Sequence, residues 1–433
     1  MKRKAILGAA LALLAFLAAS AQQTAPAPDK VKTDNAELRR QSFEKVWQTI
    51  NDNHFDPTFG GVDWQKTREI YAPQIAAAKT DAEFYRIMQR MIGELKLSHF
   101  SIYPQNLNVD SAAGGGEGTL GIELKMLDGK AVIARIEKDS GAERANLKTG
   151  FVVEKVDGKT VAEILAPLEK NLAARGENER VVKLYAERTL ANMLNGKPDS
   201  IAKIEISDEK NQARNFDVKR SLAKTEMSLA IGNFPAQPVL FESKLLSENI
   251  GYIRFNMWTI PQMPKIRQAI RDFAGAKGIV FDLRGNPGGI GGMASGVAGL
   301  LMNERATLGS MNSRSTKTEF IVYPQTAPFA GKVIVLTDYG SASTSEVFAA
   351  GLQENGRARI VGERSAGAVL PSVFTVLPIG AIFQYPVSDY KSPKNVLIEK
   401  RGVAPDTEIK QTRAAFLENK DLPLEEAIRQ ILN

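Results

Sequence analysis

Three scarcities limit the chemistry open to this chain of 433 residues. It has no cysteine, so disulfides, thiolate nucleophiles and cysteine-ligated metals are excluded. It has only two histidines, His54 and His99, which excludes a histidine-rich metal site. Its formal net charge is only +7 and the cations are dispersed, so nucleic acid is not an expected partner. The length and a hydrophobic fraction of 43% still allow two or three soluble domains.

The first 21 residues have the pattern of a secretory signal. Three cations at positions 2–4 precede an apolar run over 5–19, and Ala19-Ser20-Ala21 has the small-x-small form of a signal-peptidase site. Removing the three cations lowers the formal charge from +7 to +4. We expect an exported mature chain in the periplasm or the medium, with no membrane segment and a Pro/Ala-rich flexible linker over 22–36.

The next two regions differ in periodicity. Residues 37–104 repeat apolar side chains at helical spacing and predict an N-terminal helical domain, followed by a linker that ends in three glycines. Residues 117–221 predict short strands with turns at Asp128-Gly129 and Asp157-Gly158. A long helical insertion at 161–194 and a closing hairpin at 201–220 complete this second domain.

Residues 223–433 alternate between strand and helix patterns, which is typical of an α/β domain with βαβ crossovers. The predicted strands are 250–255, 278–283, 332–336 and 358–361, and the predicted helices are 264–273, 293–302, 345–355 and 424–432. In such a domain functional sites lie at the carboxyl ends of the parallel strands. Two motifs fall at such ends.

The first motif is a serine cluster between a predicted strand and a predicted helix. Ser341, Ser343 and Ser345 lie where strand 332–336 gives way to helix 345–355. This geometry can expose one hydroxyl beside free N–H groups at a positively polarised helix start, as an attacking oxygen requires. The alternative is that the serines only cap the helix.

The second motif is the glycine-rich run DLRGNPGG at 282–289, which follows a buried strand. Glycines there let backbone N–H groups approach a ligand closely. Neither a P-loop nor a dinucleotide fingerprint is present, so an oxyanion site is favoured over a phosphate site. Asp282 and Arg284 are expected to be structural partners that hold the turn.

Three segments together carry a family resemblance. DLRGNPGG at 282–289, GSASTSEVFAAGLQENGRARIVGER at 340–364 and IEKRGVAPD at 398–406 resemble, in this order, the C-terminal processing peptidases and the tricorn core protease. The resemblance implies a crotonase-like (ClpP-type) α/β core over 223–433, with an N-terminal helical region and an inserted PDZ domain.

The segment at 117–221 itself resembles a PDZ domain. Its motif SGAERANLKTGFVVEKVDG departs from the family pattern at Phe151, where aspartate is usual. The resemblance implies that a peptide's terminal carboxylate is received by the loop Gly118, Thr119, Leu120, Gly121 and Ile122. The alternative is a rigid spacer that binds nothing.

The resemblance also implies a catalytic set. The nucleophile would be Ser343, but the lysine base of the processing peptidases is replaced by Ala368 in GERSAGAVLPS. The tricorn-like branch uses a histidine preceded by serine, which implies His99 as general base, oriented by Ser98 and Glu399. His54 is expected to be structural. The oxyanion donors would be the amides of Thr344 and of either Gly288 or Gly289.

These observations predict an exported serine endopeptidase that cleaves polypeptides through an acyl-enzyme on Ser343 and needs no metal or organic cofactor. Substrates would be recognised by their C-termini through the PDZ domain, as in tail-specific proteases. The main alternative is a non-catalytic ligand- or peptide-binding protein on the same fold. A scaffold in which only the PDZ domain matters and a peptidase confined to short oligopeptides are the others.

Overall fold

The computed structural model describes residues 35–104, 117–174, 177–222 and 225–433. The predicted signal peptide, nearly all of the predicted linker at 22–36 and the glycines at 114–116 lie outside these ranges. Within the described ranges, no helix combines the length and the apolar character needed to cross a bilayer.

The N-terminal region is helical, as predicted. It contains α1 (Asn35–Asn53), the 3-10 turn η1 (Phe59–Gly61), α2 (Trp64–Ala77) and α3 (Asp81–Gly93). The side chains of Asp63 and Thr80 accept hydrogen bonds from the first turns of α2 and α3, so both helices begin at capped positions. His54 is buried, and its ring stacks on Phe55 and Phe100.

This helical region packs against a segment from the far end of the sequence. Strand β1 (Ser101–Tyr103) pairs with β20 (Ile382–Pro386), which pairs with β19 (Ser372–Val376). The buried side chains Leu377, Ala381 and Phe383 join the core formed by α1, α2 and α3. The end of the helical region, where Ser98 and His99 lie, is thereby anchored to the C-terminal half of the chain.

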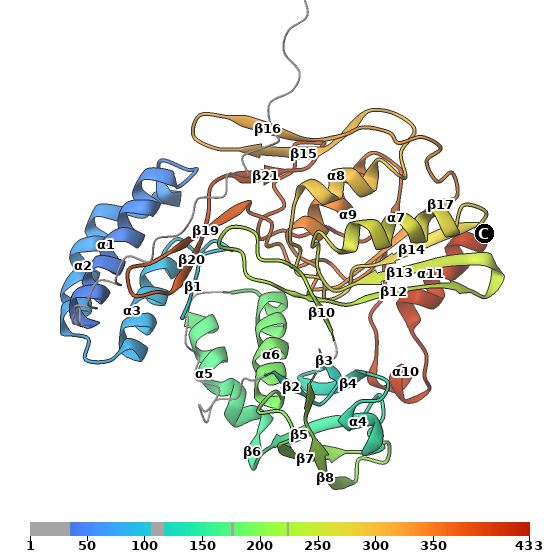
Figure 1. Ribbon diagram of the computed structural model, residues 1–433, viewed down its shortest axis with the longest axis horizontal. Coiled ribbons are helices and arrows are strands. Elements are labelled where there is room, and N and C mark those ends of the chain that lie inside the picture. Colours follow the sequence, from blue (N-terminus) through green and yellow to red (C-terminus); the bar gives the residue numbers. More distant parts are fainter. Residues whose placement is uncertain (1–34, 105–116, 175–176, 223–224) are drawn as a thin grey trace, which may run out of the picture. The chain divides into compact units, whose positions relative to one another are not determined.

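The second region, residues 117–222, has its own hydrophobic core within the one compact unit that residues 35–433 form, and we call it the small β domain. Its main sheet has the order β3-β4-β5-β7-β8, with β6 paired to β5, and two longer helices lie on it (Figure 1). The strands are β3 (Ile122–Leu127), β4 (Lys130–Ile136), β5 (Val152–Val156), β6 (Lys159–Thr160), β7 (Ile201–Ser207) and β8 (Ala213–Lys219). The helices are α4 (Gly141–Arg144), α5 (Val161–Ala174) and α6 (Glu179–Leu194), and a short pair joins β2 (Gly118–Thr119) to β9 (Ser221–Leu222). Both predicted turns, the helical insertion and the closing hairpin are confirmed.

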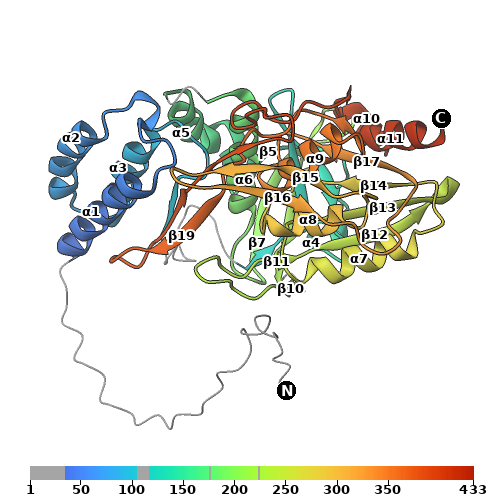
Figure 2. The same cartoon turned by 90° about the horizontal axis from the view of Figure 1, so that it is seen from above.

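The third region is built on a six-stranded sheet of order β12-β13-β14-β17-β18-β22. All neighbours are parallel except the antiparallel edge pair β12 and β13. The strands are β12 (Phe241–Leu246), β13 (Ile250–Phe255), β14 (Gly278–Asp282), β17 (Lys332–Thr337), β18 (Arg359–Gly362) and β22 (Thr407–Glu408). Its helices are α7 (Gln262–Asp272), α8 (Gly292–Ala298), α9 (Thr344–Glu354) and α11 (Leu422–Leu432), which Figure 2 shows from a second side. This is the predicted α/β arrangement.

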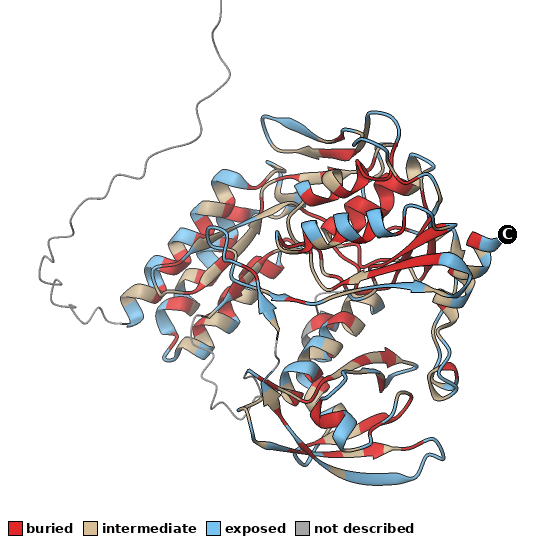
Figure 3. Ribbon diagram, turned by 45° about the vertical axis from the view of Figure 1, so that its right-hand side comes forward, coloured by how far each residue is buried: buried red, intermediate tan, exposed pale blue. Residues whose placement is uncertain are grey.

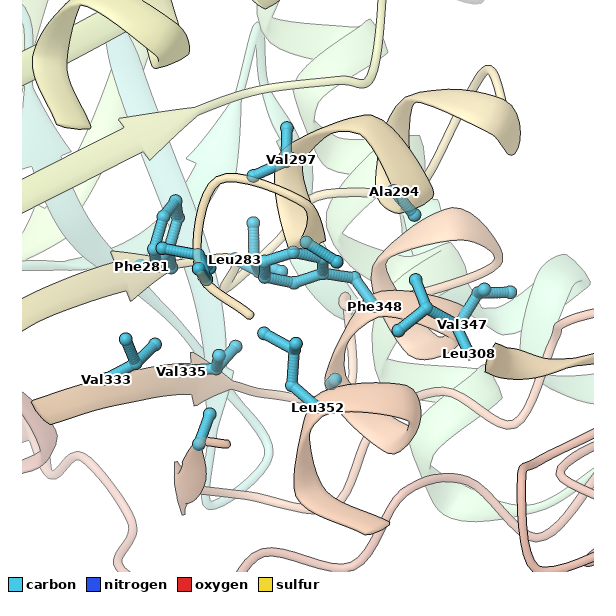
Figure 4. Close-up of a cluster of buried hydrophobic side chains, with 14 of the residues drawn as sticks. Phe281, Leu283, Ala294, Val297, Leu308, Val333, Val335, Val347, Phe348 and Leu352 are labelled. Atoms are coloured by element: carbon cyan, nitrogen blue, oxygen red, sulfur yellow. The ribbon is translucent and has the colours of Figure 1, made fainter. Parts of the chain in front are cut away.

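Helices cover both faces of this sheet. On one face Phe281, Val333 and Val335 pack with Phe348 and Leu352 of α9 (Figure 4). On the other face alternate strand residues pack with Ala427 and Ile431 of α11. The central strands are therefore buried along almost their whole length (Figure 3), as their continuous apolar runs predict. Both motif loops start from the carboxyl edge of this rigid sheet.

Several elements were not predicted from the sequence. The sheet β16-β15-β21 consists of β15 (Ala306–Asn312), β16 (Lys317–Val322) and β21 (Asp389–Lys391), and smaller elements are β10 (Glu226–Met227), β11 (Pro238–Val239), η2 (Ser247–Asn249) and α10 (Arg413–Leu417). The predicted helix 293–302 is too long, because α8 ends at Ala298. The carbonyls of Gly299 and Leu300 instead accept hydrogen bonds from the N–H groups of Gln325 and Phe329.

Candidate active site

The three serines at the turn between β17 and α9, which we call the serine turn, differ in burial and in hydrogen bonding. The Ser341 hydroxyl donates to the Leu283 carbonyl at 2.7 Å, and the Ser345 hydroxyl donates to the Asn286 carbonyl at 3.1 Å; both serines are fully buried. Ser343 is half-buried and lies at the N-cap of α9 with φ 55° and ψ −118°. Non-glycine residues rarely adopt a positive φ, and such strain clusters at functional sites. Ser343 is thus set apart from its neighbours.

The backbone of Ser343 is held by a buried glutamate and a neighbouring segment. Its N–H donates to the Ala368 carbonyl at 2.8 Å and to Glu346 Oε2 at 3.1 Å. Glu346 also accepts from the Ser365 hydroxyl at 2.5 Å and from the N–H groups of Gly367 and Ala368 at 2.8 and 2.9 Å. Burial raises the pKa of Glu346 to about 7, although these hydrogen bonds oppose the shift. Glu346 therefore fastens segment 365–368 to the serine turn.

Ser98, His99 and Glu399 form a hydrogen-bonded chain. The Ser98 hydroxyl lies 2.7 Å from His99 Nδ1 and donates to Glu399 Oε2 at 3.0 Å, while the Ser98 N–H donates to Glu399 Oε1 at 2.8 Å. A serine hydroxyl has one proton, so the bond to His99 must use a proton on Nδ1. The lone pair of this imidazole is consequently on Nε2, the nitrogen that faces away from Ser98.

Burial governs the electrostatics of this chain. Burial, followed by the positive charge of Arg188, lowers the pKa of His99 to about 4, so the imidazole is neutral at neutral pH. Burial also raises the pKa of Glu399, whereas the donors from Ser98 and from the Val369 N–H, at 3.0 Å, favour its carboxylate form. Two adjacent residues thus link the two parts of the site. The Ala368 carbonyl accepts from the Ser343 N–H, and the Val369 N–H donates to Glu399.

The glycine loop lies directly against the serine turn. A Cβ on Gly288, where φ is 97°, would lie 2.6 Å from Ser343 Cβ and 2.8 Å from the Thr344 nitrogen. The Gly288 N–H is already bonded to Asn286 Oδ1 at 3.0 Å. The N–H groups of Gly289 and Thr344, by contrast, have no hydrogen-bond partner among the described residues. These two amides are free to bind an anionic oxygen.

Asp282 and Arg284 brace the start of the glycine loop. Arg284 donates to both Asp282 and Asp421, and Tyr252 donates its hydroxyl proton to Asp282. Burial opposes the charged form of Asp282, but Arg284 outweighs it and lowers the pKa of this carboxyl well below its usual range. The two other residues that bond to this pair, Tyr252 and Asp421, do not belong to the predicted catalytic set.

Two predicted groups are not joined directly to the serine. No hydrogen bond connects the Ser343 and His99 side chains within the part of the chain that the structure describes. The loop 118–122 lies in the small β domain, where the Leu120 and Gly121 carbonyls accept from the N–H groups of Ala142 and Glu137.

Across the described ranges, no cluster of three His, Cys, Asp or Glu side chains could hold a metal ion.

Sequence reasoning did not single out Glu346. Its position three residues after Ser343 matches a capping box, in which the third residue of a helix accepts from the N-cap amide. That spacing was visible in the sequence and could have identified it. Sequence reasoning also missed Asp338, the residue directly after β17, and its ion-pair partner Lys125 in the small β domain.

Comparisons with known proteins indicate one peptidase family. Residues 249–409 match the model of peptidase family S41, and residues 35–93 match the model of the tricorn protease C1 domain. The carboxyl-terminal-processing protease of Synechocystis sp. is 26% identical over 392 residues, which cover 89% of this chain and 83% of the relative. The carboxy-terminal processing protease CtpB of Bacillus subtilis is 26% identical over 309 residues, which cover 70% of this chain and 57% of the relative.

Solved structures support the same fold. A photosystem II D1 C-terminal processing protease matches with a TM-score of 0.56 and 22% identity, over 86% of this chain and 93% of that one. Mature CPAF matches with a TM-score of 0.63 and 14% identity, over 88% of this chain and 94% of that one. At these identities the likeness concerns the fold.

Proposed function

Because this chain belongs to peptidase family S41 and is a serine-type peptidase, we propose that it is an exported endopeptidase in which His99 activates Ser343. The observation that carries the proposal is the pairing of a strained, half-buried serine at a helix start with a hydrogen-bonded chain of half-buried Ser98, half-buried His99 and buried Glu399. A binder with no turnover has no use for this combination.

The first step is attack by the Ser343 hydroxyl on the carbonyl carbon of the scissile peptide bond. His99 Nε2 takes the hydroxyl proton as the new C–O bond forms, and gives it to the leaving amine when the C–N bond breaks. Water then attacks the acyl-enzyme, with His99 again acting as base, and releases the acid. Nε2 is suited to this role because Nδ1 holds its proton toward Ser98.

Glu399 acts on His99 through the Ser98 hydroxyl. The carboxylate accepts the Ser98 proton, which keeps the serine oxygen as an acceptor for Nδ1–H. This arrangement fixes the tautomer and stabilises the imidazolium that forms in the transition state. The low pKa of His99 in the free enzyme makes that support necessary, since burial disfavours the cation.

The oxyanion formed from the substrate carbonyl binds to the free amides of Thr344 and Gly289. Gly288 is the weaker candidate because its N–H is engaged by Asn286. Gly288 contributes in another way, since only a residue without a Cβ fits against Ser343 there. Each such donor contributes about 3–4 kcal/mol to lowering the barrier.

A lysine-dependent mechanism has less support. Residue 368, which corresponds to the lysine of the processing peptidases, is alanine, and its backbone contacts both Ser343 and Glu346. Lys400 is near in the chain to Glu399, but it is exposed to solvent. This favours the tricorn-like catalytic set. The crotonase-like core is also part of the proposal, and its support is the resemblance carried by the segments at 282–289, 340–364 and 398–406.

We further propose that residues 117–221 form a PDZ domain that presents polypeptide C-termini to this site. Its support is the fold of short strands closed by a hairpin, in which β3 is an edge strand of the main sheet and follows the loop 118–122. Export to the periplasm or the medium rests on the signal pattern in residues 1–21.

A fluorophosphonate probe tests this function. The purified mature chain should be labelled on the peptide that contains Ser343, and Ser343→Ala and His99→Ala should abolish labelling. His54→Gln is the matched control, because it removes the only other histidine. Absence of label on a folded wild-type chain, or label that survives loss of His99, would favour the binding protein instead.

A further inference from the structure

A buried carboxylate ties the serine turn to the glycine loop. Asp338 comes directly after β17, and its Oδ1 accepts from the N–H groups of Gly285 and Gly340 at 2.8 and 2.9 Å. Its own N–H donates to the Ser341 hydroxyl at 3.0 Å. The Asp338 side chain thus fixes the relative position of the two loops that supply Ser343, Thr344 and Gly289.

The cation that pairs with Asp338 comes from the small β domain. Lys125 of β3 places Nζ 2.6 Å from Asp338 Oδ2, and the two side chains are only 13% and 6% exposed. Among the described residues, no other cation lies within ion-pair distance of Asp338. Burial lowers the pKa of Lys125, but Asp338 and Glu187 outweigh it, so this pKa lies well above that of a free lysine. Both partners are charged at neutral pH.

Helix α6 closes the same cluster. Glu187 lies 3.5 Å from Lys125 Nζ, accepts the hydroxyl proton of Tyr339, and accepts the Met126 N–H of β3 at 2.8 Å. Tyr339 is the second residue of the serine turn and is 2% exposed. The Lys125 ammonium also lies 5.1 Å from the centre of its ring. Two successive residues of the serine turn therefore bind groups of the small β domain. Asp338 pairs with Lys125 of β3, and Tyr339 donates to Glu187 of α6.

The same helix also reaches the Glu399 turn. Arg180, in the first turn of α6, donates to the carbonyls of Lys400 and Arg401 at 3.1 and 3.3 Å. Arg180 and Glu187 are seven residues apart, which places them on one face of the helix. One face of α6 thus touches both turns that carry predicted catalytic residues.

A buried ion pair is a poor source of stability, because desolvation offsets much of the attraction. Such a pair is better suited to fixing one arrangement, since removing either partner leaves a buried charge unpaired. From this geometry we propose that Lys125 and Glu187 of the small β domain are positioning residues. They hold the serine turn and the glycine loop in the relative position that the reaction requires. This inference rests on the proposed function and names groups outside the catalytic core on which that function depends.

Two lysine variants and one matched control test the proposal. Lys125→Met removes the charge, and Lys125→Arg retains it. Arg135→Met is the control, because Arg135 on β4 also links the small domain to the core, through Glu242 at 2.8 Å, but touches neither turn. We expect Lys125→Met to lower the maximal rate of fluorophosphonate labelling about 10- to 100-fold, with the half-saturating probe concentration within about twofold. Lys125→Arg should recover most of that rate, and Arg135→Met should stay within about twofold of wild type.

Hydrogen exchange provides a readout that does not depend on activity. The amides of Gly285 and Gly340, which donate to Asp338, should lose protection in Lys125→Met and keep it in Arg135→Met. If wild type is not labelled, the proposed function fails, while the exchange data still decide whether Lys125 orders the turn. If Lys125→Met does not fold, the isosteric Asp338→Asn serves in its place. Unchanged labelling and unchanged exchange in a folded variant, or equal losses in the Arg135→Met control, would overturn the inference.

Discussion

Glu399 contacts His99 only through the Ser98 hydroxyl, and this serial arrangement has a measurable consequence. Hydrogen bonds to charged groups contribute about 1.5–3 kcal/mol, which corresponds to about 10- to 150-fold in rate. Ser98→Ala should lower the labelling rate by this factor, because His99 Nδ1–H loses its acceptor. Glu399→Gln should lower the labelling rate at least as much. The new NH2 group would replace a carboxylate oxygen that now accepts from Ser98 or Val369, so two donors would face each other.

The double variant distinguishes a serial chain from two independent contributions. If Glu399 acts through Ser98, the variant with both substitutions should be about as slow as the slower single variant, with a coupling energy of about 1.5–3 kcal/mol. The double-mutant cycle is measured with the second-order labelling rate constants of wild type, Ser98→Ala, Glu399→Gln and the double variant. Unfolding curves check that each protein is folded. Glu408→Gln is the matched control, because Glu408 is exposed and its one ion pair among the described residues is with Lys410. Losses that multiply in the double variant would refute the serial arrangement.

Four further predictions concern the glycine loop, the pH dependence of the rate, the pH dependence of stability, and the core. Gly288→Ala should abolish labelling and cost about 1–3 kcal/mol of stability, measured by labelling and urea unfolding, because φ is 97° and the new Cβ would press on Ser343. The acid limb of the kcat/KM profile should lie near pH 4, because burial lowers the pKa of His99 to about 4 and the neutral base persists down to that pH; a limb near 6.5 would contradict it. For the same reason, wild type should lose stability relative to His99→Gln as pH falls from about 6.5 toward 4, where only the unfolded chain binds the proton readily. Phe348→Ala should cost about 3–5 kcal/mol in urea unfolding, because this fully buried ring packs between Phe281 and Trp258; a cost below about 1 kcal/mol would show that the core beneath α9 is less tightly packed.

Much of the central sheet was predictable because its signals are local. The apolar runs that became β14 and β17 are typical of strands buried on both faces, and each motif loop begins where such a run stops. The two Asp-Gly turns of the small β domain were readable for the same reason, since each lies between two short strands. The strained conformation of Ser343 has no signature in its residue type, and only the structure reveals it.

Long-range contacts could not be predicted from local pattern. Ser98 and Glu399 are 301 positions apart, and their hydrogen bonds depend on packing β1 against β20 and on the path of the chain after β19. The family resemblance suggested that they meet, but their catalytic roles stay a prediction. Lys125 gave no signal at all, because a lysine on a short strand is usually a solvated residue and its partner lies in another domain.

The most direct test of the central claim is intact-protein mass spectrometry of the mature chain, quenched with acid during turnover of a peptide thioester. If Ser343 is the nucleophile, the protein should gain the mass of the peptide acyl group less one hydrogen, located on the peptide that contains Ser343 and absent in Ser343→Ala. His99→Ala should form this adduct at least about 10³-fold more slowly. A role for Ser343 as nucleophile and His99 as base would be contradicted by hydrolysis without any adduct in a rapid-quench series, by an adduct on another residue, or by acylation at an unchanged rate without His99.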